Sequence, residues 1–410
     1  MQNFELKIDN VSSAEKKLRE TSLGYFNTNG FPNKRLEDWK FTDLNKIIKD
    51  NFRELKPDSS FEVKSAFEVI KDFEHNSIIL INGVLKSHNF NHEEKKNIKV
   101  QEYKKISTKQ TKSNNPMINL NNALNKGGYI LEVSKNYRFN KPLIVYNYFS
   151  DNMTNKIVNN KNSIILNDNC NLDLIEHNSD ICKGNFVQNN YTNVKIGNKS
   201  SLKNYTVQGH KSNGFYYKFI KINLSEESKY EDYIFSSGLK FNKIEEDVDI
   251  NGENVNCSIQ SALFLDQDSH QEIKTQLNHL KPNSKSFQKI KNVLSKNCKG
   301  VYQGKIFVKD LAQKTDAYQL SKALLLSESS EFNAKPELEI YADDVKCSHG
   351  STSGSINEDS IYYLRTRGIN RKNAIELLTK AFLFEIADKI TDIKIKKFIE
   401  KNLDRQIYGH

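Results

Sequence analysis

The sequence predicts a mainly β protein, a solenoid of the parallel β-helix type with helical segments at both ends. A repeat is the first observation, because an apolar residue followed by a tight polar turn recurs at a loose period. Helical periodicity is nearly absent for about two hundred residues after Gly128, and helix-capping signals occur near both termini. The anchors of the repeat are Leu166, Ile196, Leu224, Ile250 and Leu280, which are 30, 28, 26 and 30 residues apart.

A period of about 28 residues suits one coil of a β-helix that holds two or more strands. Each coil would bury its inward side chains on its neighbours, and no coil would be stable alone. A β-sandwich of long hairpins also produces short strands separated by turns. Sandwiches rarely keep a fixed spacing over five units, so the repeat favours the solenoid.

Residues 1–118 are expected to form a helical and mixed N-terminal region. Residues 12–15 fit a capping box, and Gly30 and Pro32 stop the helix that follows. A second helix is expected over about 39–52, where Trp39 would anchor the region to a core. Residues 77–81 form one clear strand, closed by an Asn-Gly turn.

Residues 119–355 are expected to form the β-helix core, and residues 356–410 a C-terminal helical region. Asn357 can cap one helix, Gly368 lies where that helix would end, and Asn370 can cap the next. The second helix has an apolar surface broader than one stripe, which indicates either a partner surface or a helix that closes the end of the solenoid. Its apolar residues are Ala374, Ile375, Leu377, Leu378, Ala381, Phe382, Phe384 and Ile386.

The charge and the apolar content exclude several classes. The chain has 61 Lys and Arg against 51 Asp and Glu, a net charge of +10 that is spread along all 410 residues. A solvated lysine-rich surface is expected, not a nucleic-acid interface. No apolar run approaches the ~20 residues of a membrane span, and no secretory signal begins the sequence, so a cytoplasmic protein is expected. Glycine pairs without a Walker lysine or a strand-to-helix context argue against nucleotide binding.

Five cysteines are widely spaced and include no Cys-x-x-Cys pair, which argues against a zinc ribbon or a ferredoxin-type cluster. A reduced compartment is expected, with each thiol buried as a small hydrophobe unless it has a particular neighbour. The five are Cys170, Cys182, Cys257, Cys298 and Cys347.

Cys347 and His349 are the strongest candidate site. Two residues apart in a strand, they would project from the same face. A thiol beside an imidazole is either an activated nucleophile or half of a soft metal site, and a metal site would need ligands from elsewhere in the fold or from another chain. A half-buried cysteine beside a surface histidine remains an equal alternative. Glu176, His177 and His270 are weaker candidates, and these histidines are expected to be solvated.

Two long segments resemble the SufB/SufD family of iron–sulfur cluster assembly proteins. Residues 342–350 read Ala-Asp-Asp-Val-Lys-Cys-Ser-His-Gly, and residues 361–369 follow with Ile-Tyr-Tyr-Leu-Arg-Thr-Arg-Gly-Ile. Residues 35–44, around Glu-Asp-Trp-Lys-Phe-Thr, are similar to the N-terminal segment of the same family. The resemblance spans nearly the whole chain, and the Cys-Ser-His-Gly form favours the SufD branch.

The resemblance implies a right-handed parallel β-helix with helical flanks and a non-catalytic scaffold role. It implies a complex with SufB and the ATPase SufC, with the C-terminal helical region docking on SufC. Cys347 and His349 would lie near a SufB cysteine and share a transient iron–sulfur cluster or iron with it. His349 would be an iron ligand or proton acceptor and Cys347 a supporting thiol. A reduced flavin is suggested for such complexes, and a homodimer is the alternative to the pairing with SufB.

A β-helix enzyme that acts on a polysaccharide or an acyl donor is the rival hypothesis. It would need a groove lined by carboxylates or by Arg and Lys, and such enzymes are often secreted. Neither feature is visible in the sequence.

Overall fold

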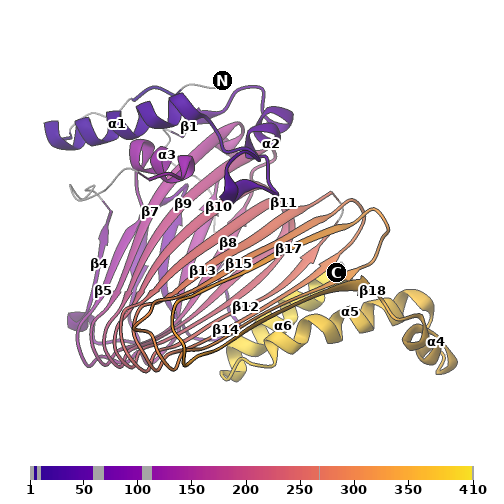
Figure 1. Ribbon diagram of the computed structural model, residues 1–410. Coiled ribbons are helices and arrows are strands. Elements are labelled where there is room, and N and C mark those ends of the chain that lie inside the picture. Colours follow the sequence, from indigo (N-terminus) through magenta and orange to yellow (C-terminus); the bar gives the residue numbers. More distant parts are fainter. Residues whose placement is uncertain (1–3, 7–10, 59–68, 104–112, 267, 409–410) are drawn as a thin grey trace.

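The computed structural model describes residues 4–6, 11–58, 69–103, 113–266 and 268–408. Strands of this part of the chain stack into a parallel β-helix, with helices gathered at the N-terminal side and along one flank (Figure 1). The predicted fold class is confirmed. The alternative of a β-sandwich is wrong, because the strands of the coils pair with one another in parallel.

Two ladders of parallel strands form the walls of the solenoid. β10 (Ser201–Leu224) and β11 (Lys229–Ile250) are long enough to take part in both walls. The other strands of the first ladder are β5 (Tyr129–Val133), β7 (Lys156–Leu166), β9 (Phe186–Ile196), β13 (His270–His279), β15 (Lys299–Val308) and β17 (Glu331–Ile340). Those of the second ladder are β2 (Asn76–Ile81), β6 (Leu143–Phe149), β8 (Asn171–Asp180), β12 (Asn256–Leu265), β14 (Lys285–Leu294), β16 (Asp316–Leu325) and β18 (Lys346–Ser355).

The predicted repeat is the register of the first ladder. Leu166 pairs with Ile196, Ile196 with Leu224, and Leu224 with Ile250. The next anchor was predicted one residue too late, because Ile250 pairs with His279 and not with Leu280. The turn between β13 and β14 is one residue longer than the first turns of the solenoid. Leu280 therefore already belongs to the corner.

Many corners of the solenoid contain a residue in the left-handed region. Non-glycine residues adopt this region at a cost, which is lowest for Asn and Asp. Here the turn amides hydrogen-bond to the next coil, as Lys199 N does to Glu226 O at 2.9 Å, so stacking stabilises the strained corner. The corner residues with positive φ are Asn169, Lys199, Glu227, Asn254, Asp268, Asn283, Asn297 and Lys314.

The interior of the solenoid combines apolar columns with a polar centre. Columns of Ile, Leu and Val, such as Val194, Ile222 and Val248, form the largest buried cluster. Polar groups lie beside them, and the Lys218 ammonium lies 2.6 Å from a Glu176 carboxylate oxygen. Glu246 and Asp232 are in electrostatic contact, and burial raises the pKa of both carboxyls. This interior pair therefore retains a proton more readily than exposed carboxyls do.

The N-terminal helices pack on the outer surface of the first ladder. α1 (Ser13–Asn29) begins at the Ser12 cap and ends at Gly30, as predicted. The second helix is shorter than expected, because the Asp43 side chain caps α2 (Leu44–Asn51) and leaves only a 3₁₀ turn, η1 (Glu37–Trp39), before it. α3 (Pro116–Leu124) lies beneath α1.

One hairpin and two further strand pairings complete the N-terminal region. The predicted strand is β2, and Asn82 and Gly83, both with positive φ, turn it into antiparallel β3 (Val84–Asn89). β4 (Ile98–Glu102) pairs antiparallel with β5, and β1 (Lys56–Pro57) pairs with β7. Short 3₁₀ turns η2 (Lys95–Asn97) and η3 (Asp151–Met153) occur at corners.

Trp39 anchors this region, as predicted. Its indole is buried and packs against the Tyr217 ring at 5.3 Å between centroids. The Lys243 ammonium lies 4.1 Å from the indole centroid and 2.5 Å from Glu272. A buried cation between an aromatic face and a carboxylate therefore joins the N-terminal segment to β11 and β13.

The C-terminal region has three helices, α4 (Glu358–Thr366), α5 (Arg371–Ala387) and α6 (Ile393–Tyr408). Asn357 and Asn370 cap the first two, as predicted. α5 and α6 bury Leu383, Ile386 and their neighbours against the outer face of the second ladder. The hypothesis that this helix closes the end of the solenoid is wrong, because the helices lie along its flank (Figure 1).

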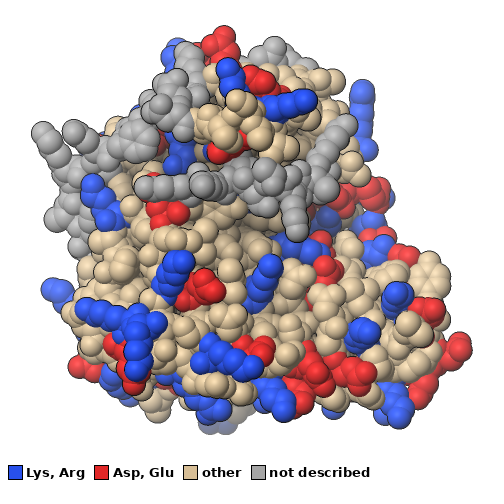
Figure 2. Space-filling view, turned by 90° about the vertical axis from the view of Figure 1, so that its left-hand side faces the viewer, with Lys and Arg blue, Asp and Glu red and all other residues tan. Residues whose placement is uncertain are grey.

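Acidic and basic side chains are interspersed over the face shown in Figure 2, in keeping with a mixed, solvated surface. No helix in the described part of the chain is long and apolar enough to span a membrane. The divisions at residues 118 and 355 stay predictions, although β2 joins the N-terminal region to the second ladder.

The attachment of α5 should depend on Leu383. Replacing this fully buried residue by Ala should reduce the free energy of unfolding by about 2–5 kcal/mol, because it removes apolar burial and leaves a cavity. Leu377→Ala, at a residue 45% exposed on the same helix, is the matched control and should change it by less than about 0.5 kcal/mol. Urea denaturation monitored by circular dichroism measures both, and equal effects would contradict this packing.

Candidate functional site

Cys347 and His349 lie on β18, the last strand of the solenoid. Cys347 is in register with Ala317 and His349 with Gln319, both of which are buried in the preceding coil. Because side chains alternate across a strand, Cys347 and His349 share the side that faces the interior. The prediction that they project from one face is therefore confirmed.

The terminal coil leaves this pair accessible. In earlier coils the inward column is covered on both sides, whereas no described residue stacks on the far side of β17 and β18. Cys347 is consequently half-buried and His349 exposed. The Cys347 side chain packs beside Ala317 and Ala342, and Ile340 at the same end is partly exposed.

The chain by itself does not activate the thiol. Burial raises the pKa of Cys347, nearby Asp316 raises it further, and only the Ala317 backbone amide opposes the shift. The sulfur is therefore protonated at neutral pH, and a metal or a nearby cation is needed to favour the thiolate. No group of three or more His, Cys, Asp or Glu suited to a metal occurs in the described part of the chain. Cys347 and His349 are thus at most two donors of a larger set.

A hydrogen-bonded pair beneath His349 was missed by the sequence reasoning. The Tyr302 hydroxyl donates to Gln319 Oε1 at 3.1 Å, and the Gln319 side-chain amide donates to the Glu337 carbonyl at 3.4 Å. Gln319 is the register neighbour of His349, so this pair fixes the floor on which the imidazole lies. No motif marks these residues, because only the coil register brings them together.

The other cysteines are buried, as predicted for small hydrophobes. Burial also raises the pKa of Cys257 and Cys298. These thiols lie in earlier coils and do not join Cys347.

The two weaker histidine candidates, His177 and His270, are not both solvated. His270 packs against the N-terminal region, where its Nε2 lies 2.8 Å from the Thr42 hydroxyl beside Glu272. Burial lowers the pKa of His270 to about 4. The expectation of a solvated His270 is wrong, because η1 and the residues after it cover this part of β13. Glu176 instead pairs with Lys218 inside the solenoid, and neighbouring His177 lies against Tyr146.

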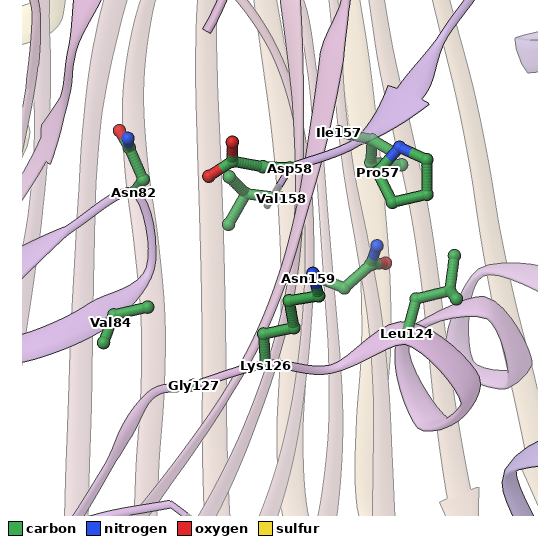
Figure 3. A pocket seen from close by; sticks show the side chains of 10 residues that line it. All are labelled: Pro57, Asp58, Asn82, Val84, Leu124, Lys126, Gly127, Ile157, Val158 and Asn159. Carbon is green, nitrogen blue, oxygen red and sulfur yellow. The ribbon is translucent and has the colours of Figure 1, made fainter. Parts of the chain in front are cut away.

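A small pocket lies among the first coils, far along the solenoid axis from β18. It encloses about 20 Å³, room for about one water molecule. Its described lining contains neither cysteine nor histidine (Figure 3). This pocket is therefore not a second thiol–imidazole site. Its lining residues are Pro57, Asp58, Asn82, Val84, Leu124, Lys126, Gly127, Ile157, Val158 and Asn159.

The fold and the site define a class: a parallel β-helix protein whose neighbouring thiol and imidazole lie at an uncovered end. Comparison with known families adds the particular one. The model of the SufBD core domain, described as SUF system FeS cluster assembly, matches residues 148–382, and the model of the SufBD N-terminal region matches residues 2–145. The chain belongs to the SufBD family of the SUF system for iron–sulfur cluster assembly.

The individual relatives that the chain resembles agree with this family. The chain is 36% identical to iron–sulfur cluster assembly protein SufD of Escherichia coli over 160 residues, which are 39% of this chain and 38% of that protein. A SufBD family protein of Synechocystis is 27% identical over 384 residues, 88% of this chain and 84% of the relative. Protein ABCI7, chloroplastic, of Arabidopsis thaliana is 27% identical over 215 residues, 52% of this chain and 45% of the relative.

The free energy of unfolding should fall as the pH is lowered from about 6.5 to about 4. His270 and His279 both have pKa values lowered by burial to about 4, so the unfolded chain, with histidine pKa values near 6.5, binds more protons in this window. Each histidine should reduce the free energy of unfolding by up to about 1.4 kcal/mol per pH unit as the pH falls. Glu272, whose pKa is lowered chiefly by Lys243 against the opposing effect of burial, acts in the same direction below about 4.5.

Urea denaturation at several pH values measures this slope. The slope should become shallower in His279→Gln, while His88→Gln, at an exposed histidine of β3, should leave it unchanged. Equal slopes in His279→Gln and the unmodified chain would contradict the assignment.

Proposed function

We propose that this chain is a non-catalytic scaffold subunit of a cytoplasmic SUF complex, in which it pairs with SufB and with the ATPase SufC. The observation that carries the proposal is the uncovered terminal coil, which presents Cys347 and His349 beside unpaired strand edges. Family membership and the similarity to E. coli SufD support it over the β-helix enzyme.

The terminal coil has the features of an interface. β17 and β18 present backbone groups and inward side chains that the described part of this chain does not cover, and an open sheet edge is a template for another strand. Partly buried Leu338 and Ile340 with 37% exposure would gain burial from a partner coil. SufB, a second chain of the same family, would be that partner, and a homodimer would use the same end when SufB is absent.

Iron or a nascent cluster is cargo at this junction. His349 would supply an imidazole ligand or accept a proton, and Cys347 a supporting sulfur, while SufB thiolates complete the donor set. Soft thiolate donors suit iron–sulfur clusters, and metal binding would displace the thiol proton that burial now retains. A reduced flavin belongs to the proposed complex, with no contact assigned to this chain.

His349→Ala should leave the complex assembled and abolish cluster formation on it. The imidazole is exposed in this chain, so its removal costs little stability but deletes a donor that the two-residue site cannot replace. The measurement is the yield of the purified complex together with its anaerobic absorbance spectrum after reconstitution with iron and sulfide.

Ser353→Ala is the matched control, because Ser353 is exposed on the same strand and on the same side. It should retain normal assembly and a normal spectrum. A normal cluster yield in His349→Ala would overturn the role given to this residue.

The proposed SufC surface is narrower than the sequence suggested. Phe382 and Phe384 pack against the buried C-terminal cluster, and Leu378 is half-buried. Leu377 remains exposed, and α4 has two further exposed aromatic side chains. We assign the docking surface to Leu377, Tyr362 and Tyr363, whose side chains are 45%, 70% and 58% exposed.

Leu377→Glu combined with Tyr362→Glu should reduce SufC capture at least tenfold, because the charges would have to be desolvated in the interface. A pull-down of SufC by the purified chain measures the effect. Ile393→Glu, at a residue 66% exposed on α6 outside this surface, is the control and should bind normally. Unchanged capture by the double variant would exclude the surface.

A further inference from the structure

Two aromatic stacks stand on the outer face of the second ladder, with a gap between them. Tyr205 and Tyr233 stack on β10 and β11, with centroids 5.3 Å apart and planes 13° from parallel. Phe287 and Tyr318 stack on β14 and β16 at 5.7 Å and 21°. β12 lies between the two stacks and contributes no aromatic side chain at the corresponding positions.

The gap has a polar floor. Gln260 is in register with Tyr233, and Ser258 is in register with Phe287. The Gln260 amide nitrogen lies 3.2 Å from the Ser258 oxygen and donates to it, so the Ser258 hydroxyl can donate its own proton outward. One face of the Phe287 ring is covered by Tyr318, and the other face borders Ser258.

This gap is part of a groove of about 550 Å³, a size typical of small-molecule sites. The loop after α5 forms one wall, and Thr391 in this loop accepts a hydrogen bond from Lys203 at 2.9 Å. The lining residues are Lys229, Tyr230, Glu231, Tyr233, Asn256, Cys257, Ser258, Gln260, Lys285, Ser286, Phe287, Asp316, Tyr318, Lys389 and Thr391.

The spacing of the strands fits one ring. Neighbouring strands are about 4.8 Å apart, so side chains on β11 and β14 are separated by roughly 10 Å across β12. A planar ring above Ser258 would stack on Phe287 and continue the aromatic ladder by one step. Aromatic rings stack favourably on a nucleobase whatever its sequence, because every base has a π face.

We propose that this groove binds a planar heteroaromatic ring that carries a phosphate, the chemistry of a mononucleotide. The ring would lie over Ser258 against Phe287, with a ring nitrogen accepting from the Ser258 hydroxyl. The site differs from the glycine-rich loops whose absence argued against nucleotide binding, because it relies on stacking and on lysine side chains.

Lysines on the rim supply the charge that a phosphate needs. Lys229, Lys285 and Lys389 are exposed, and none of them forms an ion pair with a carboxylate of the described residues. Two acids also line the groove: Glu231 accepts a hydrogen bond from the Tyr233 hydroxyl at 3.0 Å, and Asp316 is in register with Lys285. The lining therefore has three cationic against two anionic side chains, and lysine binds phosphate as a point charge.

Calorimetric titration of the purified chain with adenosine 5′-monophosphate tests the proposal. Saturable binding is expected, with weaker binding of adenosine, which lacks the phosphate, and of ribose 5-phosphate, which lacks the ring. Phe287→Ala should weaken binding about tenfold or more, the loss typical of one stacking contact. Tyr341→Ala, at an exposed tyrosine outside the groove, is the control and should bind normally.

Ser258→Phe gives a second test that does not depend on removing a packed ring. The new side chain should fill the gap, abolish nucleotide binding and preserve the thermal unfolding midpoint. Absence of saturable binding to the unmodified chain, or equal binding by Ser258→Phe with its fold intact, would overturn the proposal. Binding of an acidic peptide that contains tryptophan, without binding of the nucleotide, would also overturn it and assign the groove to a protein segment.

Discussion

In-register stacking of coils is the constraint on which the rest of this structure depends. Each inward side chain is buried only because the same position of the next coil covers it, as Val248 covers Ile222 within the main cluster. The strained corners are stabilised in the same way, because turn amides such as that of Lys199 bond across coils. A solenoid of this kind gains stability coil by coil, and its last coil is necessarily incomplete.

The helices at either end of the chain stabilise the walls and leave the final coil open. The N-terminal segment is joined to the first ladder by Trp39, Lys243 and Glu272, whose buried charges are paired with each other. Glu385 of α5 pairs with Lys289 and Lys291 of β14 on the opposite wall, and these lysines lower the pKa of Glu385 to about 2. Such contacts fix where the helices attach, since a buried charge is costly without its partner.

The uncovered coil explains why the Cys347 and His349 side chains are accessible. Cys347 and His349 occupy an inward column that elsewhere contains buried side chains such as Ala317 and Gln319. Their accessibility therefore follows from the position of β18 and needs no special loop. In the complex proposed above, a second chain that completes the column would bury the apolar edge and bring its own side chains to the sulfur and the imidazole.

The sequence alone determined the β-helix, the caps at Ser12, Asn357 and Asn370, and the placement of Cys347 and His349 on one side of a strand. These features are local, because they depend on spacing within a segment or on a period repeated along it. Tertiary structure decided that His279 and not Leu280 anchors its coil, that His270 is covered, and that α5 lies on the flank of the solenoid. Gln319 beneath His349 and the gap over Ser258 likewise arise between coils about thirty residues apart, where register and not local pattern sets the neighbours.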